Sequence, residues 1–143
     1  MINSISKILE SVTLVRMLQT VEKTWGGEQF AYRAARGTEL HLAEVYTTIT
    51  GFLADNQFVF LANLDISGAF DAVSHDYLLR SLRDAGVDLF LLRYVSVWLR
   101  ERKFRLKLMS HRGRFLSKSR HISCGLPQGG VLSPFLWNTF STD

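Results

Sequence analysis

The sequence predicts an α+β fold, in which several helices are segregated from a small antiparallel sheet. Three observations support this prediction. Apolar residues recur at helical spacing in several stretches, residues 104–109 alternate between apolar and mostly basic side chains, and residues 58–65 form a short apolar run that ends in an aspartate. A chain of 143 residues, of which 47% are hydrophobic, can bury a sizeable core as one domain.

Two helices are expected in the first 56 residues. Residues 4–24 have helical periodicity, and Trp25 with the two glycines that follow it ends this helix. Thr38 is expected to cap a second helix, which ends before the turn at Asp55–Asn56. The periodicity of the first helix comes from an apolar stripe made of Ile5, Ile8, Leu9, Val12, Val15, Leu18 and Val21.

Three further helices are expected in the second half of the chain. The first begins after Ser74, its expected N-cap, and is stopped by Gly86. Residues 89–100 form the next one. A last helix is expected over residues 132–140, after a glycine-rich loop, with Ser133 as its N-cap.

Strands are expected in two places. Residues 58–65 are apolar and β-prone, which suits a strand that is buried on at least one face. Residues 104–109 predict a strand with a basic face, followed by a hairpin turn at residues 110–114 and a return strand over residues 115–122. The basic side chains of this hairpin are Arg105, Lys107, Arg112, Arg114, Lys118 and Arg120.

The charge distribution points to a polyanionic partner. Between Arg93 and Arg120 there are ten basic residues and one acidic residue, whereas positions 1–92 hold seven basic and eleven acidic residues. This basic third is expected to face a polyanion. Cys124 is the only cysteine, which excludes an internal disulfide and a thiolate metal site, and no disulfide-linked partner is expected. The single cysteine fits a reducing compartment and no signal-peptide pattern opens the chain, so we expect an intracellular protein of the cytoplasm or nucleus. No apolar run reaches the length of a membrane span, so no membrane partner is expected.

Residues 64–73, LDISGAFDAV, put a carboxylate at the end of an apolar strand. Asp65 would stand at the mouth of a cleft, where an oxygen ligand on a rigid element suits Mg²⁺. Taken alone, however, Asp65 is more often a strand-end or turn aspartate, and Phe70 a core residue. Asp71 and His75 are expected to cap, pair or hydrogen-bond locally.

Residues 124–134, CGLPQGGVLSP, form a loop shaped by glycine and proline. Its three glycines allow a positive φ or the close approach of a ligand, and Pro127 stiffens the segment. Gln128 can donate and accept hydrogen bonds at once. A glycine-rich loop that leads into a helix is a weak sign of a phosphate site, and a plain connector is the common alternative.

In this order, the two segments resemble motifs A and B in the palm of reverse transcriptases of the non-LTR retrotransposon type. The resemblance implies a right-hand polymerase fold and RNA-directed DNA synthesis, with an RNA template, a DNA primer, deoxynucleoside triphosphates and Mg²⁺. It implies that Asp65 binds the catalytic metal, and that Phe70 lies under the sugar of the incoming nucleotide and excludes a 2′-hydroxyl. It also implies that Gln128 and Gly129 lie near the nascent base pair and the template.

The resemblance extends to the start of the chain. Residues 7–10, KILE, and residues 29–38, QFAYRAARGT, are similar to fingers segments of the same enzymes. Arg33 and Arg36 would there lie toward the template or the triphosphate, and the alternative is that they are solvated loop arginines.

The whole chain, residues 1–143, is therefore expected to be an incomplete reverse transcriptase domain. Residues 1–56 correspond to fingers-like helices and residues 57–143 to a partial palm. The paired aspartates of motif C would follow Asp143, so we expect an internal fragment of a longer reading frame.

Two other functions stay open at this point. The chain could be a non-catalytic remnant of a degenerate element, which binds nucleic acid through the basic hairpin while Asp65 is idle. It could also be a helical interaction module, because its helices carry broad apolar faces. The hairpin charges themselves have a further explanation, since basic residues keep an edge strand from pairing with other chains.

We predict that the 143-residue chain has no polymerase activity on its own. Asp65 is its one candidate palm carboxylate, and metal-ion catalysis needs several oxygen ligands in fixed geometry. For the same reason, Mg²⁺ binding is expected of the complete enzyme rather than of this chain. Template–primer extension with Mg²⁺ or Mn²⁺ is the assay. Robust incorporation that Asp65→Asn abolishes would contradict the prediction.

Overall fold

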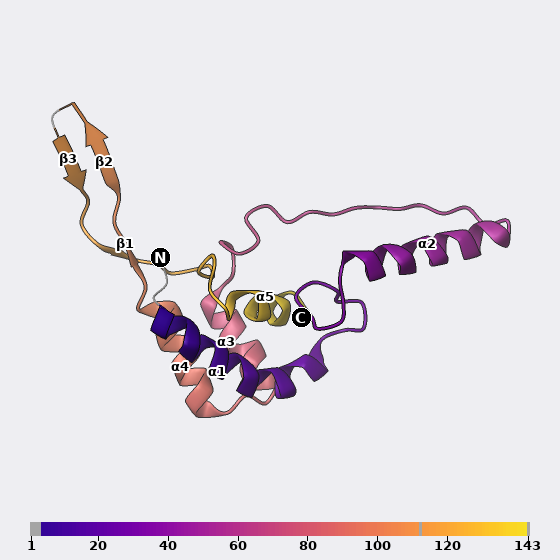
Figure 1. Ribbon diagram of the computed structural model, residues 1–143, viewed down its shortest axis with the longest axis horizontal. Helices are drawn as coiled ribbons and strands as arrows, with labels where there is room; N and C mark the ends of the chain where they lie inside the picture. The colour runs from indigo at the N-terminus through magenta and orange to yellow at the C-terminus, as the bar shows by residue number, and fades with distance from the viewer. Residues whose placement is uncertain (1–3, 112, 143) are drawn as a thin grey trace.

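The computed structural model describes residues 4–111 and 113–142 and combines helices with short antiparallel strands, as the α+β prediction requires (Figure 1). No helix in these two ranges is long and apolar enough to cross a membrane. The helices are α1 (Ser4–Val21), α2 (Thr38–Ala54), α3 (His75–Asp84), α4 (Leu89–Arg100) and α5 (Ser133–Ser141), with a 3₁₀ turn, η1 (Glu22–Thr24), after α1. The strands are β1 (Lys103–Phe104), β2 (Lys107–Ser110), β3 (Gly113–Leu116) and β4 (Arg120–His121).

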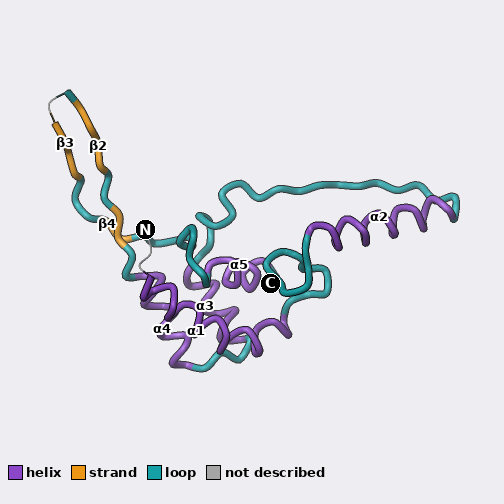
Figure 2. Tube along the Cα trace, viewed as in Figure 1, coloured by secondary structure: helices purple, strands orange, loops and turns teal. Residues whose placement is uncertain are grey.

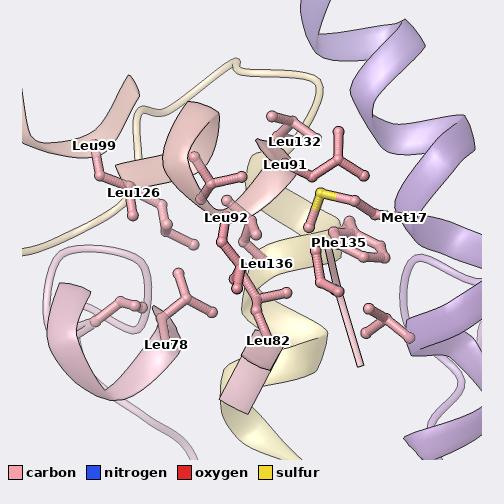
Figure 3. Packing of buried hydrophobic residues seen from close by; sticks show 14 of the residues in the cluster. Met17, Leu78, Leu82, Leu91, Leu92, Leu99, Leu126, Leu132, Phe135 and Leu136 are labelled. Carbon is pink, nitrogen blue, oxygen red and sulfur yellow. The ribbon is translucent and has the colours of Figure 1, made fainter. Parts of the chain in front are cut away.

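Helices α1, α3, α4 and α5 enclose the hydrophobic core. Leucines of α3 and α4 pack against α5 and the loop that precedes it, and Met17 of α1 closes the cluster from another side (Figure 3). Burial of these apolar side chains supplies the main favourable term for folding. The buried cluster consists of Met17, Val21, Trp25, Val73, Leu78, Leu82, Val87, Leu91, Leu92, Val95, Leu99, Leu126, Leu132, Phe135 and Leu136.

Most of the apolar stripe that predicts α1 is exposed, and Val21 is its one fully buried member. Ile8 and Val15 are 64% and 65% exposed. The buried side chains of this helix are Glu10, Thr13, Met17 and Val21, two of which are polar. The helix itself and its end are confirmed, but hydrophobic periodicity alone gives the wrong orientation.

The predicted caps of the middle helices differ in their outcome. Ser74 caps α3 as predicted, because its Oγ accepts a hydrogen bond from the backbone N–H of Tyr77 at 3.4 Å. Helix α4 covers the predicted residues, and Asp88 caps it through the N–H groups of its first turn. The prediction that Thr38 caps α2 is wrong, because Thr38 is the first helical residue and Gly37 occupies the N-cap position.

The predicted buried strand over residues 58–65 is not formed. This segment is extended but belongs to neither of the two sheets, and Phe58 and Leu64 are 95% and 96% exposed. Helix α2 has no buried residue, and together with the segment after it forms an arm that runs out from the other helices and back (Figure 2). A β-prone sequence becomes a strand only where another strand accepts its hydrogen bonds, and the described residues provide none here.

The basic hairpin is confirmed, although its ladder is interrupted. Strands β2 and β3 pair antiparallel with Lys107 opposite Leu116 and Met109 opposite Arg114. The shorter strands β1 and β4 pair next to them. The two ladders are linked where the Ser117 hydroxyl accepts the N–H of Leu106 at 2.8 Å. The hairpin projects from the helices, and all described residues of β3 and β4 are exposed (Figure 1).

Residues 70–74 and 124–126 meet through their backbones. The Gly125 N–H donates to the Val73 carbonyl and the Leu126 N–H to the Phe70 carbonyl, each at 2.8 Å. Gly125 has a φ of +82°, and a Cβ atom at this position would lie 2.9 Å from the carbonyl oxygen of Asp71. Both the positive φ and the close approach of two backbones therefore require glycine here.

We predict that Gly125→Ala destabilises the fold more than Gly129→Ala does. Gly129 has a similar φ of +80°, but a Cβ atom there meets nothing within 4 Å. Gly129→Ala should therefore cost only the left-handed strain, about 1–2 kcal/mol. Gly125→Ala adds a clash with backbone, which costs about 1–3 kcal/mol more. Urea unfolding of the two variants measures the difference, and equal losses of unfolding free energy would show that the two backbones are not in close contact.

Candidate nucleotide-binding site

The two motifs meet at a cavity of about 340 Å³. Phe70 comes from the first motif, and Gln128 and Gly129 from the second. The sequence resemblance assigns these three residues to the nucleotide, and the fold brings all three to one surface depression. The complete lining is Tyr32, Phe70, Gln128, Gly129, Gly130, Ser133 and Pro134.

Phe70 is held between two other aromatic rings. Trp137 of α5 stacks on it with ring centroids 5.7 Å apart, and Tyr32 meets it edge-on at 6.3 Å. Phe70 is only partly buried and packs against the core cluster, so it is both a core neighbour and part of the cavity wall. Aromatic contacts of this kind fix the ring's orientation.

Tyr32 is a lining residue that the sequence did not single out. Its backbone has a φ of +57°, which is uncommon for a residue with a side chain, and the residue is 58% exposed. This conformation occurs in the loop between α1 and α2, where the aromatic ring reaches the cavity. Its place inside the resembling segment at residues 29–38 was the one available signal.

Two side chains hold the first end of the glycine-rich loop. His75 Nε2 lies 2.9 Å from the Gly125 carbonyl oxygen, and the Arg102 guanidinium donates to the same oxygen. Because a carbonyl can only accept, His75 carries a proton on Nε2. Burial lowers the pKa of Arg102, and the nearby Cys124 opposes this shift. The expectation that His75 bonds locally is wrong, since its partner lies 50 residues away.

Glu10 holds the other end of the loop. Its Oε2 accepts from the backbone N–H groups of Val131 at 2.7 Å and Leu132 at 3.3 Å. The predicted N-cap, Ser133, does not cap α5: its hydroxyl donates instead to the Pro127 carbonyl at 2.6 Å. The Glu10 carboxylate from α1 instead accepts from the two backbone N–H groups that immediately precede the helix, and no side chain caps its first turn.

Glu10 is buried among hydrogen-bond donors. Its exposed fraction is 0%, and its Oε1 accepts hydrogen bonds from Trp98 Nε1 and the Ser6 hydroxyl, both at 3.2 Å. Burial and, after it, the charge of Glu10 raise the pKa of Tyr94, while a hydrogen bond with Thr13 lowers it. Sequence reasoning noted Glu10 only within the KILE segment and gave it no role.

Asp65 does not line the cavity. It is exposed, and its Oδ1 accepts a hydrogen bond from the next residue's N–H at 2.9 Å. Within residues 4–111 and 113–142, no group of three His, Cys, Asp or Glu side chains is arranged to hold a metal ion. The described residues alone therefore do not fit a two-ion magnesium site, and Asp65 stays a predicted ligand.

Arg33 and Arg36 make contacts within the loop between α1 and α2. Arg33 donates to the Gly26 carbonyl at 2.9 Å and lies 3.6 Å from the Glu22 carboxylate. Arg36 donates to the Gly27 carbonyl, and its guanidinium lies over the Phe30 ring. These contacts stabilise the loop, and contact with template or triphosphate stays a prediction for both arginines.

The basic residues of the hairpin lie apart from the cavity. Their described members are exposed, namely Arg105, Lys107, Arg114, Lys118 and Arg120. Arg112 lies outside the described residues.

Comparison with known proteins identifies the family. A sequence model described as "Reverse transcriptase (RNA-dependent DNA polymerase)" matches residues 1–143. The "RNA-directed DNA polymerase from mobile element jockey" of Drosophila melanogaster is 33% identical over 143 residues, which is 98% of this chain and 15% of the relative. The "Retrovirus-related Pol polyprotein from type-1 retrotransposable element R2" of Nasonia vitripennis is 35% identical over 80 residues, which is 56% of this chain and 7% of the relative.

The chain belongs to the reverse transcriptase family. The predicted reverse transcriptase domain of the non-LTR retrotransposon type is thereby confirmed. The chain spans about 15% of the length of the two jockey relatives.

Proposed function

We propose that this chain forms the nucleotide pocket of an RNA-directed DNA polymerase, which copies an RNA template onto a DNA primer from deoxynucleoside triphosphates. Residues 1–56 would be its fingers and residues 57–143 part of its palm. The observation that carries the proposal is the shared cavity of Phe70, Gln128 and Gly129 in a member of this family.

Each cavity residue offers a contact suited to a nucleotide. Phe70 presents a bulky ring, which leaves room for a deoxyribose and clashes with an added 2′-hydroxyl. Gln128 is exposed and carries both a donor and an acceptor, which suits the edge of a base or a sugar hydroxyl. Gly129 has no side chain, so a ligand can approach its backbone closely.

Asp65 is the proposed metal ligand of this pocket. In the complete enzyme, two Mg²⁺ ions would stabilise the attacking and leaving oxygens of the transferred phosphoryl group. Asp65 would offer one carboxylate to these ions at the end of the extended segment that leads into the first motif.

We predict that Phe70→Ala raises the use of ribonucleotides relative to deoxynucleotides. The ring excludes the 2′-hydroxyl by steric clash, so removing it should relax this discrimination by about tenfold or more. The assay is primer extension by a chimera in which residues 1–143 replace the matching segment of the jockey polymerase.

Phe90→Ala is the matched control for this test. Phe90 is an aromatic residue on α4 that is 73% exposed and does not line the cavity. Its removal should leave the ratio of incorporation efficiencies unchanged. The same unchanged ratio in Phe70→Ala would make Phe70 a core residue only.

We propose a second function, nucleic-acid binding by the basic hairpin. Alternate residues of a strand share one face, as do residues directly opposite each other in an antiparallel pair. Lys107 shares a face with Met109, and Met109 is opposite Arg114, so Lys107 and Arg114 lie on the same face of the hairpin. Both residues are exposed, and the hairpin projects from the helices. Such a face can contact phosphates without reading sequence.

We predict that binding of single-stranded RNA weakens with salt through these two residues. The slope of log affinity against log salt should be about −0.7 for each neutralised phosphate, and Lys107→Ala/Arg114→Ala should flatten it. Arg80→Ala/Arg83→Ala removes the same charge from exposed positions of α3 and should leave the slope unchanged. Equal slopes in both variants would mean that the hairpin charges do not contact phosphates and only keep an edge strand from pairing with other chains.

A further inference from the structure

We propose that Glu10 is a positioning residue that fixes the glycine-rich loop at residues 125–132 from a helix more than a hundred residues earlier in the chain. The inference rests on the proposed function, because this loop carries Gln128 and Gly129 to the nucleotide cavity. Glu10 does not line that cavity and would act only through the loop.

The hydrogen bonds of Glu10 point to this role. One carboxylate oxygen accepts from two consecutive backbone N–H groups, those of Val131 and Leu132. The other oxygen accepts from Trp98 of α4 and from Ser6. The carboxylate thus joins the end of the loop to α1 and α4 at once, with no exposure to water.

The loop is shaped to accept this carboxylate. A Cβ atom at position 130 would lie 3.3 Å from Glu10 Oε2 and 2.8 Å from the Ser133 hydroxyl. Gly130 therefore leaves the space in which the carboxylate meets the backbone. At the other end, His75 and Arg102 hold the Gly125 carbonyl. Gln128 and Gly129 lie between these two ends and are exposed, while the loop is held on both sides of them.

A substitution of Glu10 that removes its charge and keeps its shape distinguishes a role in positioning the loop from a role in packing alone. In Glu10→Gln, one oxygen becomes an NH₂ group, which can only donate. If the remaining oxygen faces Val131 and Leu132, the NH₂ group opposes the indole N–H of Trp98. If it faces Trp98, the NH₂ group opposes the two backbone N–H groups. Either arrangement leaves a buried donor without an acceptor.

Trp98→Phe removes this conflict and supplies the matched variant. In Glu10→Gln/Trp98→Phe, the glutamine oxygen can face the loop while its NH₂ group donates to the Ser6 hydroxyl. The single variant Trp98→Phe keeps the carboxylate and both of its bonds to the loop. The loop should therefore be loosened in Glu10→Gln, kept in Trp98→Phe, and largely restored in the double variant.

Hydrogen exchange of the full 143-residue chain tests this order. In Glu10→Gln, the amides of Val131 and Leu132 should exchange about tenfold faster relative to the core amides of α4. The increase should be absent in Trp98→Phe and largely reversed in the double variant. A uniform increase over the whole chain would overturn the proposal, as would equal exchange in the single Glu10 variant and the double variant. If Glu10→Gln does not fold, the double variant must fold, and its failure to do so overturns the proposal as well.

Binding of dATP, measured by calorimetry, separates this inference from the proposed function. If the unmodified chain binds dATP, Glu10→Gln should weaken binding several-fold and the double variant should recover it. Unchanged affinity in Glu10→Gln would overturn the positioning role. If the unmodified chain binds no dATP, the pocket proposal fails for this chain, and the exchange measurements still decide whether Glu10 fixes the loop.

Discussion

The cavity depends on the contact between residues 70–74 and 124–126. The two segments are about fifty residues apart in the chain, and their backbones meet only because Gly125 has no side chain. This contact brings Phe70 beside the loop of Gln128. Two backbone hydrogen bonds fix the position of one segment along the other. The hydrogen bond between His75 and the Gly125 carbonyl is a third contact between them. A shift of either segment would separate the groups that line the cavity.

The sequence predicted the helices better than their orientation. Periodicity identified α1, but most of its apolar stripe, including Ile8 and Val15, is exposed. The carboxylate of Glu10 explains this result, because it accepts hydrogen bonds in the interior from four donors, of which only Ser6 is on the same helix. Three of these donors lie 88 to 122 residues away, so no local pattern could reveal them. A hydrophobicity scale counts Glu10 as polar and assigns it to the surface, so it predicts the wrong buried face for α1.

The sequence predicted strands correctly where the pairing strand is close in the chain, and wrongly where no nearby strand is available. The hairpin supplies both strands of its main ladder within residues 107–116, and alternation correctly predicted that Lys107 and Leu108 lie on opposite faces. Residues 58–65 have an equally strong β-prone pattern but stay unpaired. At the site, the family resemblance assigned Phe70, Gln128 and Gly129 to one nucleotide, and these three residues line one cavity. The contributions of Tyr32 and Arg102 depend on loop conformations that the sequence does not specify.

Glu10 also affects the electrostatics of the pocket. The N-terminus of a helix carries a partial positive charge that attracts phosphate, but the Glu10 carboxylate already lies next to the start of α5. A triphosphate at that helix end would meet a negative charge, so its attraction would have to come from the proposed Mg²⁺ ions and from cationic side chains. Arg36 is suited to this even though it bonds to a backbone carbonyl, because a guanidinium has five N–H donors and this contact uses few of them, whereas Arg33 already lies beside the Glu22 carboxylate. Structural and phosphate-binding roles are therefore compatible in the same arginine.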